Sequence, residues 1–222
     1  MHYFPVTPLF MVLLFIVIAV WIALVEFKVI TYAYEKMGVG RSYILGILLL
    51  SLFGSGINIP IAELPAKDIV VESTVEFFGV RYAVPAIEHQ GRTVLAINLG
   101  GALIPMALSL FLLIKHKIYA EAAVGVVVMT VIVHLMAKPV HGVGIAIPTL
   151  LPPILTAVVA WLISRQHAAP LAYIAGSMGC LLGADVLNLY RIQELGAPIA
   201  SIGGAGVSDG VFLTGIIAVL LA

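Results

Sequence analysis

Long apolar segments separated by short polar ones dominate the pattern of the chain. Most of these segments approach the roughly 20 residues that a helix needs to cross a bilayer. The pattern therefore predicts an all-α integral membrane protein, a single polytopic domain over residues 1–222, with about seven transmembrane helices. We expect them at residues 7–27, 43–61, 93–114, 120–137, 145–164, 171–189 and 209–222.

The first apolar segment, Thr7 to Phe27, lacks a basic leading region and a small-residue cleavage site, so we expect a retained helix. The second segment contains Gly54, Gly56, Asn58 and Pro60 near its end, which predicts an irregular end.

Residues 63–92 interrupt the apolar pattern. They carry eight charged side chains, and the stretch VVESTVEFFGVRYAV alternates between apolar and polar positions with many β-branched and aromatic residues. Alternation with a period of two is typical of a strand, and Gly79 stands where a turn could fall. We therefore expect a short extramembrane β-hairpin, over about residues 69–85, inserted between the second and third spans.

The amino-acid composition agrees with a membrane protein and argues against some classes of binding partner. Hydrophobic residues make up 62% of the chain and charged residues 10%, against roughly a quarter charged in a soluble domain. Eleven basic and eleven acidic residues give a formal net charge of zero, so we predict no nucleic-acid partner. The expected partners are the lipid bilayer and a membrane-protein or peptide substrate, with the oligomeric state left open.

Loop charges predict the orientation. The short segment 28–42 carries three Lys and Arg residues, and cations favour cytoplasmic loops. We therefore expect a multi-pass protein of the cell membrane with its N-terminus outside.

The order of the spans places several polar segments at one face of the membrane. This face is expected to collect Asn58, Glu63, Asn98, Lys138, His141, Asp185, Asn188, Arg191 and Asp209. Charged and polar groups in membrane segments usually face the bundle interior and mark functional sites. We therefore expect the function at this face.

The positions of two of the three aspartates give the strongest indication of a functional site. Asp185 stands near the end of the sixth span and Asp209 at the start of the seventh, which places both at similar depth. Two neighbouring carboxylates share a proton, so that one acts as a base toward water and the other as an acid toward a peptide carbonyl. The same pair could instead bind a cation or relay protons. A structural reading stays open, with Asp209 as a helix N-cap and Asp185 bonded to Lys138 or Arg191.

Glycines surround both aspartates. Gly176, Gly179 and Gly183 form a stripe that permits close approach of helices. The glycines at 203, 204 and 206 allow a tight turn before Asp209, or a close approach to another backbone.

The segment from Lys138 to Gly144 breaks the helix between the fourth and fifth spans. Lys138 could tune a carboxylate and His141 could serve as a ligand or relay, or both could simply face headgroups. His134, inside a span, is expected to hydrogen-bond across helices. The sequence has no HExxH, EF-hand, P-loop or GxGxxG pattern, so we predict neither a metal nor a cofactor.

Four motifs resemble a family of prokaryotic membrane proteins, the domain-of-unknown-function family sixteen-fourteen. They are NLGGALIP at 98–105, KPVHGVGIAIP at 138–148, GADVLNL at 183–189 and SIGGAGVSDGVFLTG at 201–215. This resemblance implies a membrane fold without an activity.

The region 176–220 also resembles intramembrane aspartyl proteases of the presenilin and signal-peptide-peptidase type. Asp185-Val-Leu is similar to the motif of the first catalytic aspartate, and Ser208-Asp209-Gly is similar to that of the second. The chain reads GVSD at 206–209 where that family has GxGD, has Ala184 where the family usually has tyrosine, and shows no PAL motif after residue 209. The resemblance implies that Asp185 and Asp209 form a catalytic pair.

These observations favour a presenilin-like aspartyl endopeptidase. Supporting roles are expected for Lys138, His141, Asn98, Asn188 and the glycines 203, 204 and 206. A cation- or proton-coupled transporter or channel is the first alternative, because broken helices with polar interiors build such sites. A structural or partner-binding membrane subunit is the second.

Overall fold

The fold is a helical bundle with a small sheet at one end. The computed structural model describes residues 8–65, 67–77, 80–90, 92–140, 144–195, 198–204 and 210–222. The α-helices are α1 (Pro8–Lys36), α2 (Arg41–Gly54), α3 (Ile104–His116), α4 (Tyr119–Met136), α5 (Leu151–Ile163), α6 (Ala168–Cys180) and α7 (Gly210–Leu221). Three segments have other helical geometries: the π-helices η1 (Leu99–Leu103) and η2 (Leu181–Asp185) and the 3-10 helix η3 (Val186–Leu195).

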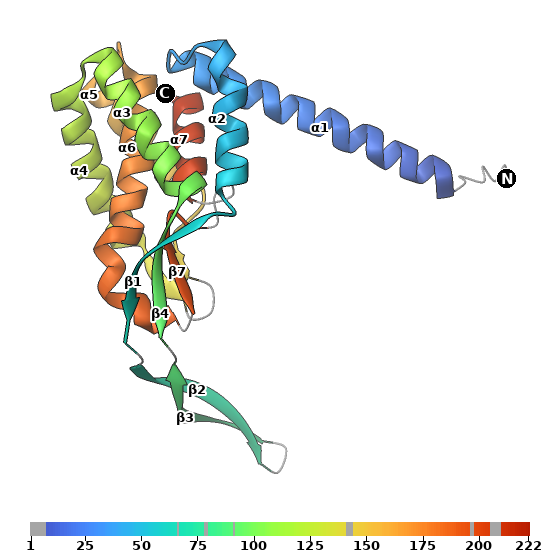
Figure 1. The fold of residues 1–222 in the computed structure, drawn as a ribbon, viewed down its shortest axis with the longest axis vertical. Helices are drawn as coiled ribbons and strands as arrows, with labels where there is room; N and C mark the ends of the chain where they lie inside the picture. The colour runs from blue at the N-terminus through green and yellow to red at the C-terminus, as the bar shows by residue number, and fades with distance from the viewer. Residues whose placement is uncertain are drawn as a thin grey trace.

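Helix α6 is the centre of the bundle. It packs against α3, α4, α5 and α7, and every one of its residues except Met178 is buried (Figure 1). Small residues make this possible, because a Cβ added at Gly179 would lie 2.5 Å from the Cβ of Met129, and one at Gly183 would lie 2.5 Å from the carbonyl oxygen of Thr130. The predicted close approach of helices along the glycine stripe is therefore confirmed.

Among the residues that the structure describes, four helical segments are long and apolar enough to cross a bilayer, as expected of a membrane protein. They are Met11–Lys36, Leu99–His116, Tyr119–Met136 and Ala168–Ile192. The other three helices, α2, α5 and α7, have 14, 13 and 12 residues. At 1.5 Å per residue they reach only about 20 Å, which is less than the hydrocarbon thickness of about 30 Å. The structure therefore contains a helix in each predicted span but does not confirm seven crossings.

Strands replace parts of three predicted spans, which corrects the all-α prediction. A three-stranded sheet has the order β1 (Asn58–Leu64), β4 (Thr93–Asn98) and β7 (Ile199–Ile202), with β4 antiparallel to β1 and parallel to β7. A short pair, β5 (Lys138–Val140) and β6 (Gly144–Ala146), precedes α5. Apolar runs rich in Ile, Leu and Val satisfy a hydropathy window equally well as strand or helix, so hydropathy alone extended the spans too far.

The predicted hairpin is confirmed. Strands β2 (Lys67–Phe77) and β3 (Val80–Gln90) form an antiparallel pair that extends away from the end of the bundle (Figure 1). Leu64 pairs with Thr93 and Lys67 pairs with Gln90, so the outer part of β1–β4 continues in the register of β2–β3, whereas the register of β1–β4 shifts between Pro60 and Ala62. The two pairs belong to two sheets that follow one another along the chain. We call them together the ribbon, of which only the outer part was predicted.

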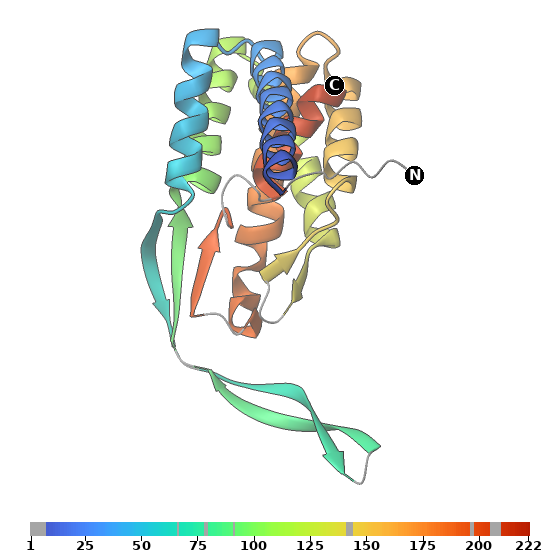
Figure 2. The ribbon, with the colours of Figure 1, turned by 90° about the vertical axis from the view of Figure 1, so that its right-hand side faces the viewer.

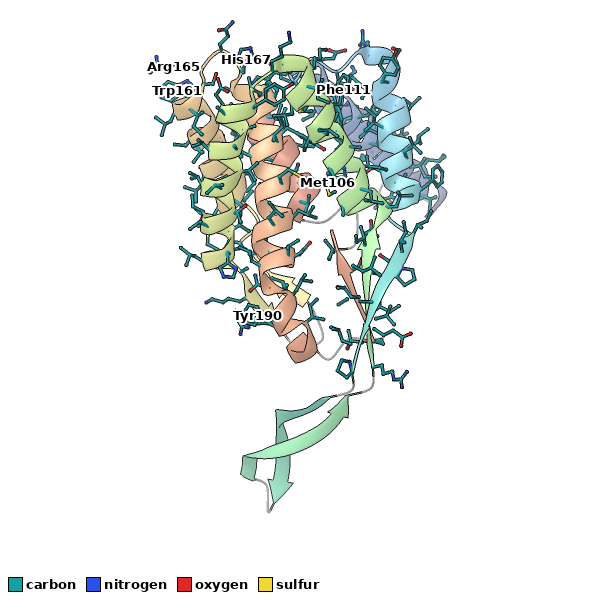
Figure 3. The ribbon with its side chains drawn as sticks, turned by 60° about the vertical axis from the view of Figure 1, so that its left-hand side comes forward. Met106, Phe111, Trp161, Arg165, His167 and Tyr190 are labelled. Carbon is teal, nitrogen blue, oxygen red and sulfur yellow. The ribbon has the colours of Figure 1, made fainter. Side chains whose placement is uncertain are left out.

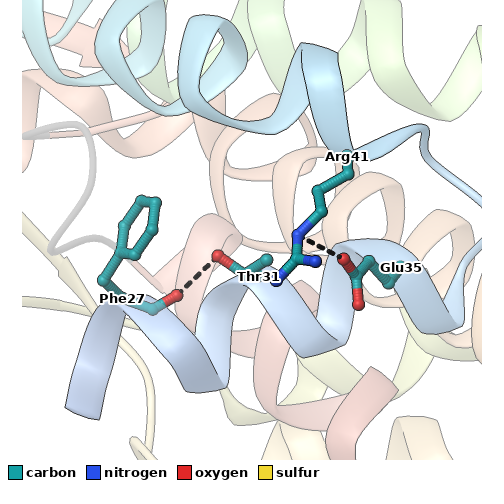
Figure 4. A network of polar contacts seen from close by, with 4 residues as sticks. All are labelled: Phe27, Thr31, Glu35 and Arg41. Atoms are coloured by element: carbon teal, nitrogen blue, oxygen red, sulfur yellow. Dashed lines mark hydrogen bonds and ion pairs between the residues drawn. The ribbon is translucent and has the colours of Figure 1, made fainter. Parts of the chain in front are cut away.

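Helix α1 leaves the bundle sideways and is largely exposed (Figure 1). Its last turn is fixed to the bundle, since the Lys36 ammonium donates to the carbonyl of Val219 at 3.0 Å. The exposed ion pair Glu35–Arg41, at 3.2 Å, bridges the turn into α2 (Figure 4). Gly38, at φ +88°, makes this turn possible.

Replacement of Gly179 by alanine should destabilise the bundle, because the new methyl group would overlap Met129. Overpacking of this kind costs about 1–3 kcal/mol. Gly46 is a matched control, since nothing lies within 4 Å of a Cβ there and α2 should gain helix propensity. Thermal unfolding in detergent measures both, and an unchanged melting temperature for Gly179→Ala would contradict the packing described.

Candidate functional site

The predicted polar face forms where the sheet meets the helices. Strand β4 runs directly into η1, and α6 runs into η2, so that two π-helical segments border the sheet end (Figure 2). A π-turn breaks the regular hydrogen-bond ladder and is frequent at functional sites. Neither π-segment was predicted.

Asn98 connects three segments at this junction. Its side chain is fully buried, and its Oδ1 accepts a hydrogen bond from the backbone N–H of Gly101 at 2.7 Å, which caps η1. Its Nδ2 donates to the carbonyl of Ser55 at 2.7 Å and to Oδ1 of Asn58 at 3.0 Å. Ser201 of β7 donates to the same Asn58 oxygen at 2.6 Å. A continuous set of hydrogen bonds therefore links β7, β1 and η1.

Asp185 lies at the end of β7. The backbone N–H of Gly203, the residue after the strand, donates to Oδ2 of Asp185 at 2.7 Å. Gly203 and Gly204 have φ values of +84° and +54°, so the predicted tight turn is confirmed at these two positions. A Cβ at Gly203 would lie 2.6 Å from the backbone nitrogen of Ala102, so the turn is pressed against η1. Glycine is needed here both for conformation and for space.

Asn188 completes the polar interior behind Asp185. It is only 2% exposed, and its Nδ2 donates to the carbonyls of Gly183 and Ala184 at 3.0 and 2.9 Å. These carbonyls belong to η2, where the π-turn disturbs regular pairing. The ring Nδ1 of His134 lies 3.3 Å from both the Asn188 amide and the Gly183 carbonyl. The expected hydrogen bond of His134 across helices is confirmed.

The predicted residues divide into three groups. The structure brings together Asn58, Asn98, Asp185, Asn188, Gly203 and Gly204 at one end of the bundle. Lys138 lies exposed at the start of β5, and Glu63 pairs with Arg92 at 3.6 Å on the exposed ribbon. His141, Gly206 and Asp209 lie outside the described residues. The meeting of the two aspartates therefore stays a prediction.

Sequence reasoning missed Ser55 and Ser201 as members of the site. Ser201 could have been found from its position, because it stands directly before the Ile-Gly-Gly sequence of the turn. Ser55 acts through its carbonyl, which no side-chain pattern reveals. Within the described ranges, no three His, Cys, Asp or Glu side chains gather as metal ligands would.

The model of one protein family matches most of the chain. This family is described as "Protein of unknown function (DUF1614)", and the match covers residues 52–221. It includes all four motifs that indicated the family in the sequence, and it excludes α1. No curated protein and no solved structure matches the chain.

Replacement of Asn98 by alanine should strongly destabilise the junction. It removes the partners of the Gly101 N–H and the Ser55 carbonyl, and a buried polar group left unpaired costs about 1–3 kcal/mol. Asn58→Ala is the matched control, since Asn58 is exposed and water can replace its bonds. Thermal unfolding in detergent should show the larger loss for Asn98→Ala, and equal losses would contradict this role.

Proposed function

Because the chain belongs to the DUF1614 family and carries a polar site at one end of its bundle, we propose that the protein is an intramembrane aspartyl endopeptidase. Asp185 and Asp209 are its catalytic pair. The observation that carries this proposal is the hydrogen bond from Gly203 to Asp185, because it holds a carboxylate at the end of a sheet-edge strand. An aspartyl protease needs a carboxylate beside an extended peptide.

Strand β7 supports the proposal by its position in the sheet. It stands last in the order β1–β4–β7, so one edge pairs with β4 and the other pairs with no described strand. An exposed edge can bind an extended peptide through main-chain hydrogen bonds. A substrate strand added to β7 would run toward Gly203 and so toward Asp185.

The chemistry follows from two carboxylates that share one proton. The ionised carboxylate takes a proton from water as the water oxygen bonds to the peptide carbonyl carbon, and the protonated carboxyl gives its proton to the carbonyl oxygen. As the tetrahedral intermediate collapses, the carboxyl that took the proton from water gives it to the nitrogen and the C–N bond breaks, while the other carboxylate takes back the proton of the former carbonyl oxygen. In this proposal Asp185, whose Oδ2 accepts the Gly203 N–H, acts as the base.

The remaining residues support this pair. Asn98 and Asn188 hold η1 and η2, which flank the Gly203 turn, and therefore position Asp185. Supporting roles are proposed for Gly204 in the turn and for Gly206. Lys138, exposed at the start of β5, and His141 are proposed to tune the charge of the site.

Orientation in the cell membrane is part of the proposal. The turns α1–α2, α3–α4 and α5–α6 lie at the end of the bundle opposite the sheet (Figure 1). These turns carry Lys36, Arg41, Lys115, Lys117 and Arg165. Arg165 lies 4.2 Å from the ring centre of Trp161, a pairing suited to the headgroup region (Figure 3). Cations at this end favour the cytoplasm, so the ribbon and the N-terminus lie outside.

Proton- or cation-coupled transport is the second candidate. The partly buried contact between His134 and Asn188 favours it, because titratable groups inside spans build proton relays. This function predicts a pH- or sodium-sensitive flux in liposomes that is lost in Asp185→Ala. A structural subunit would instead show neither cleavage nor flux.

The aspartate variants test the protease directly. Purified protein in liposomes should cleave members of a panel of single-span substrates, and Asp185→Asn or Asp209→Asn should each lower the rate on the order of 10³-fold or more. Asp68→Asn is the control, since Asp68 belongs to the ribbon strand β2 and should keep full activity. Full cleavage by a folded Asp185→Asn protein would exclude the proposed pair.

A further inference from the structure

A groove opens between α3 and α4 on the side of the bundle. The two helices are joined by the turn at Lys117 and Ile118, and α6 forms the floor between them. The groove has a volume of about 700 Å³. Its walls are apolar, with Leu110 from α3, Val127 from α4 and Met178 from the floor. Met106, which also lines it, is visible between α3 and α6 in Figure 3.

One polar group lies in this apolar wall. Ser109 lines the groove, is only 3% exposed, and its hydroxyl has no hydrogen-bond partner among the described residues. A buried hydroxyl without a partner is costly in an apolar environment. An occupant that supplies an acceptor would therefore be bound more tightly than one that fills the groove with hydrocarbon alone.

The walls also contain small residues. Ala107 of α3 and Ala122 and Ala123 of α4 line the groove. Small side chains let the backbones of two membrane helices approach closely, and hydroxyls then bond across the interface. A lipid acyl chain has no hydrogen-bond acceptor for Ser109, and the alanines do not favour its binding as they favour the close packing of a helix. A helix with a glycine or serine at the contact satisfies both features.

We infer that the groove between α3 and α4 docks a single transmembrane helix of the substrate, with a small residue placed against Ser109. Only the identity of this helix as substrate rests on the proposed function.

The position of the groove fits this role. Its lining includes Leu103, the last residue of η1, whose neighbour Ala102 lies against the Gly203 turn. Its floor includes Met178, which precedes Asp185 by seven residues, or about 10 Å of helix. A docked helix that unwinds at this end would continue as an extended strand along β7, where cleavage is proposed.

Photo-crosslinking tests the docking without a need for cleavage. The full chain with Asp185→Asn carries a photoreactive residue at Leu110 in the groove or, as control, at Leu162, which is exposed on α5 outside it. The probe is a synthetic peptide of about 20 leucines and alanines with a central Gly-Ser and flanking lysines, in phosphatidylcholine vesicles. We expect peptide adducts at Leu110 in clear excess over Leu162.

Two substitutions refine the result. Ala123→Trp should fill the groove and abolish the adduct, whereas Val124→Trp, on the same helix but outside the lining, should leave it unchanged. Ser109→Ala should lower adduct yield at subsaturating peptide about threefold, the effect of one interhelical hydrogen bond. The same change should have no effect on a peptide with leucine in place of Gly-Ser.

Lipid adducts alone at Leu110, or equal peptide yields at Leu110 and Leu162, would overturn the inference. Its failure is distinct from that of the proposed function. Cleavage by the wild type that survives Ala123→Trp would refute the groove and keep the protease. Peptide adducts in the groove without cleavage of any substrate would keep the docking site and refute the protease.

Discussion

The change from strand to helix at Asn98 is the constraint on which the rest of the polar end depends. At such a point backbone groups lose their regular partners, and water cannot replace them where the residue is fully buried, as Asn98 is. Asn98 satisfies them by capping η1 with its oxygen and bonding two segments with its amide. Because η1 is fixed in this way, the Gly203 turn has a surface to pack on, and Asp185 receives its hydrogen bond from that turn.

The small residues of α6 allow the close packing of the bundle, and they also help to position the polar residues near Asp185. They let α4 approach so closely that Gly183 stands against Thr130 and His134 reaches the carbonyl of Gly183. The same helix then continues through η2 to Asp185. Tight packing and the polar interior are therefore built on one continuous helical segment, Ala168–Ile192.

Features carried by local patterns could be predicted from the sequence, and features carried by long-range pairing could not. The ribbon tip followed from alternation, and the Gly203 turn from its glycines. The strand character of residues 93–98 did not, because a buried apolar run reads equally as helix. Ser201 and Asn58 are 143 positions apart in the sequence. They meet because β7 pairs in parallel with β4, and no local sequence pattern predicts this pairing. The π-turns likewise have no sequence pattern of their own, although they free the carbonyls that Asn188 binds.

The ribbon has a mechanical consequence. Its outer strands have 11 residues each, so at about 3.3 Å per residue the ribbon extends roughly 35 Å beyond its base. The inner strands β1 and β4 begin and end at Asn58 and Asn98, which pair directly on the inner side of a register shift between Pro60 and Ala62. A force applied to the distant tip, by a bound protein or a surface, is thus transmitted along two covalent chains to the junction that holds the Asp185 turn.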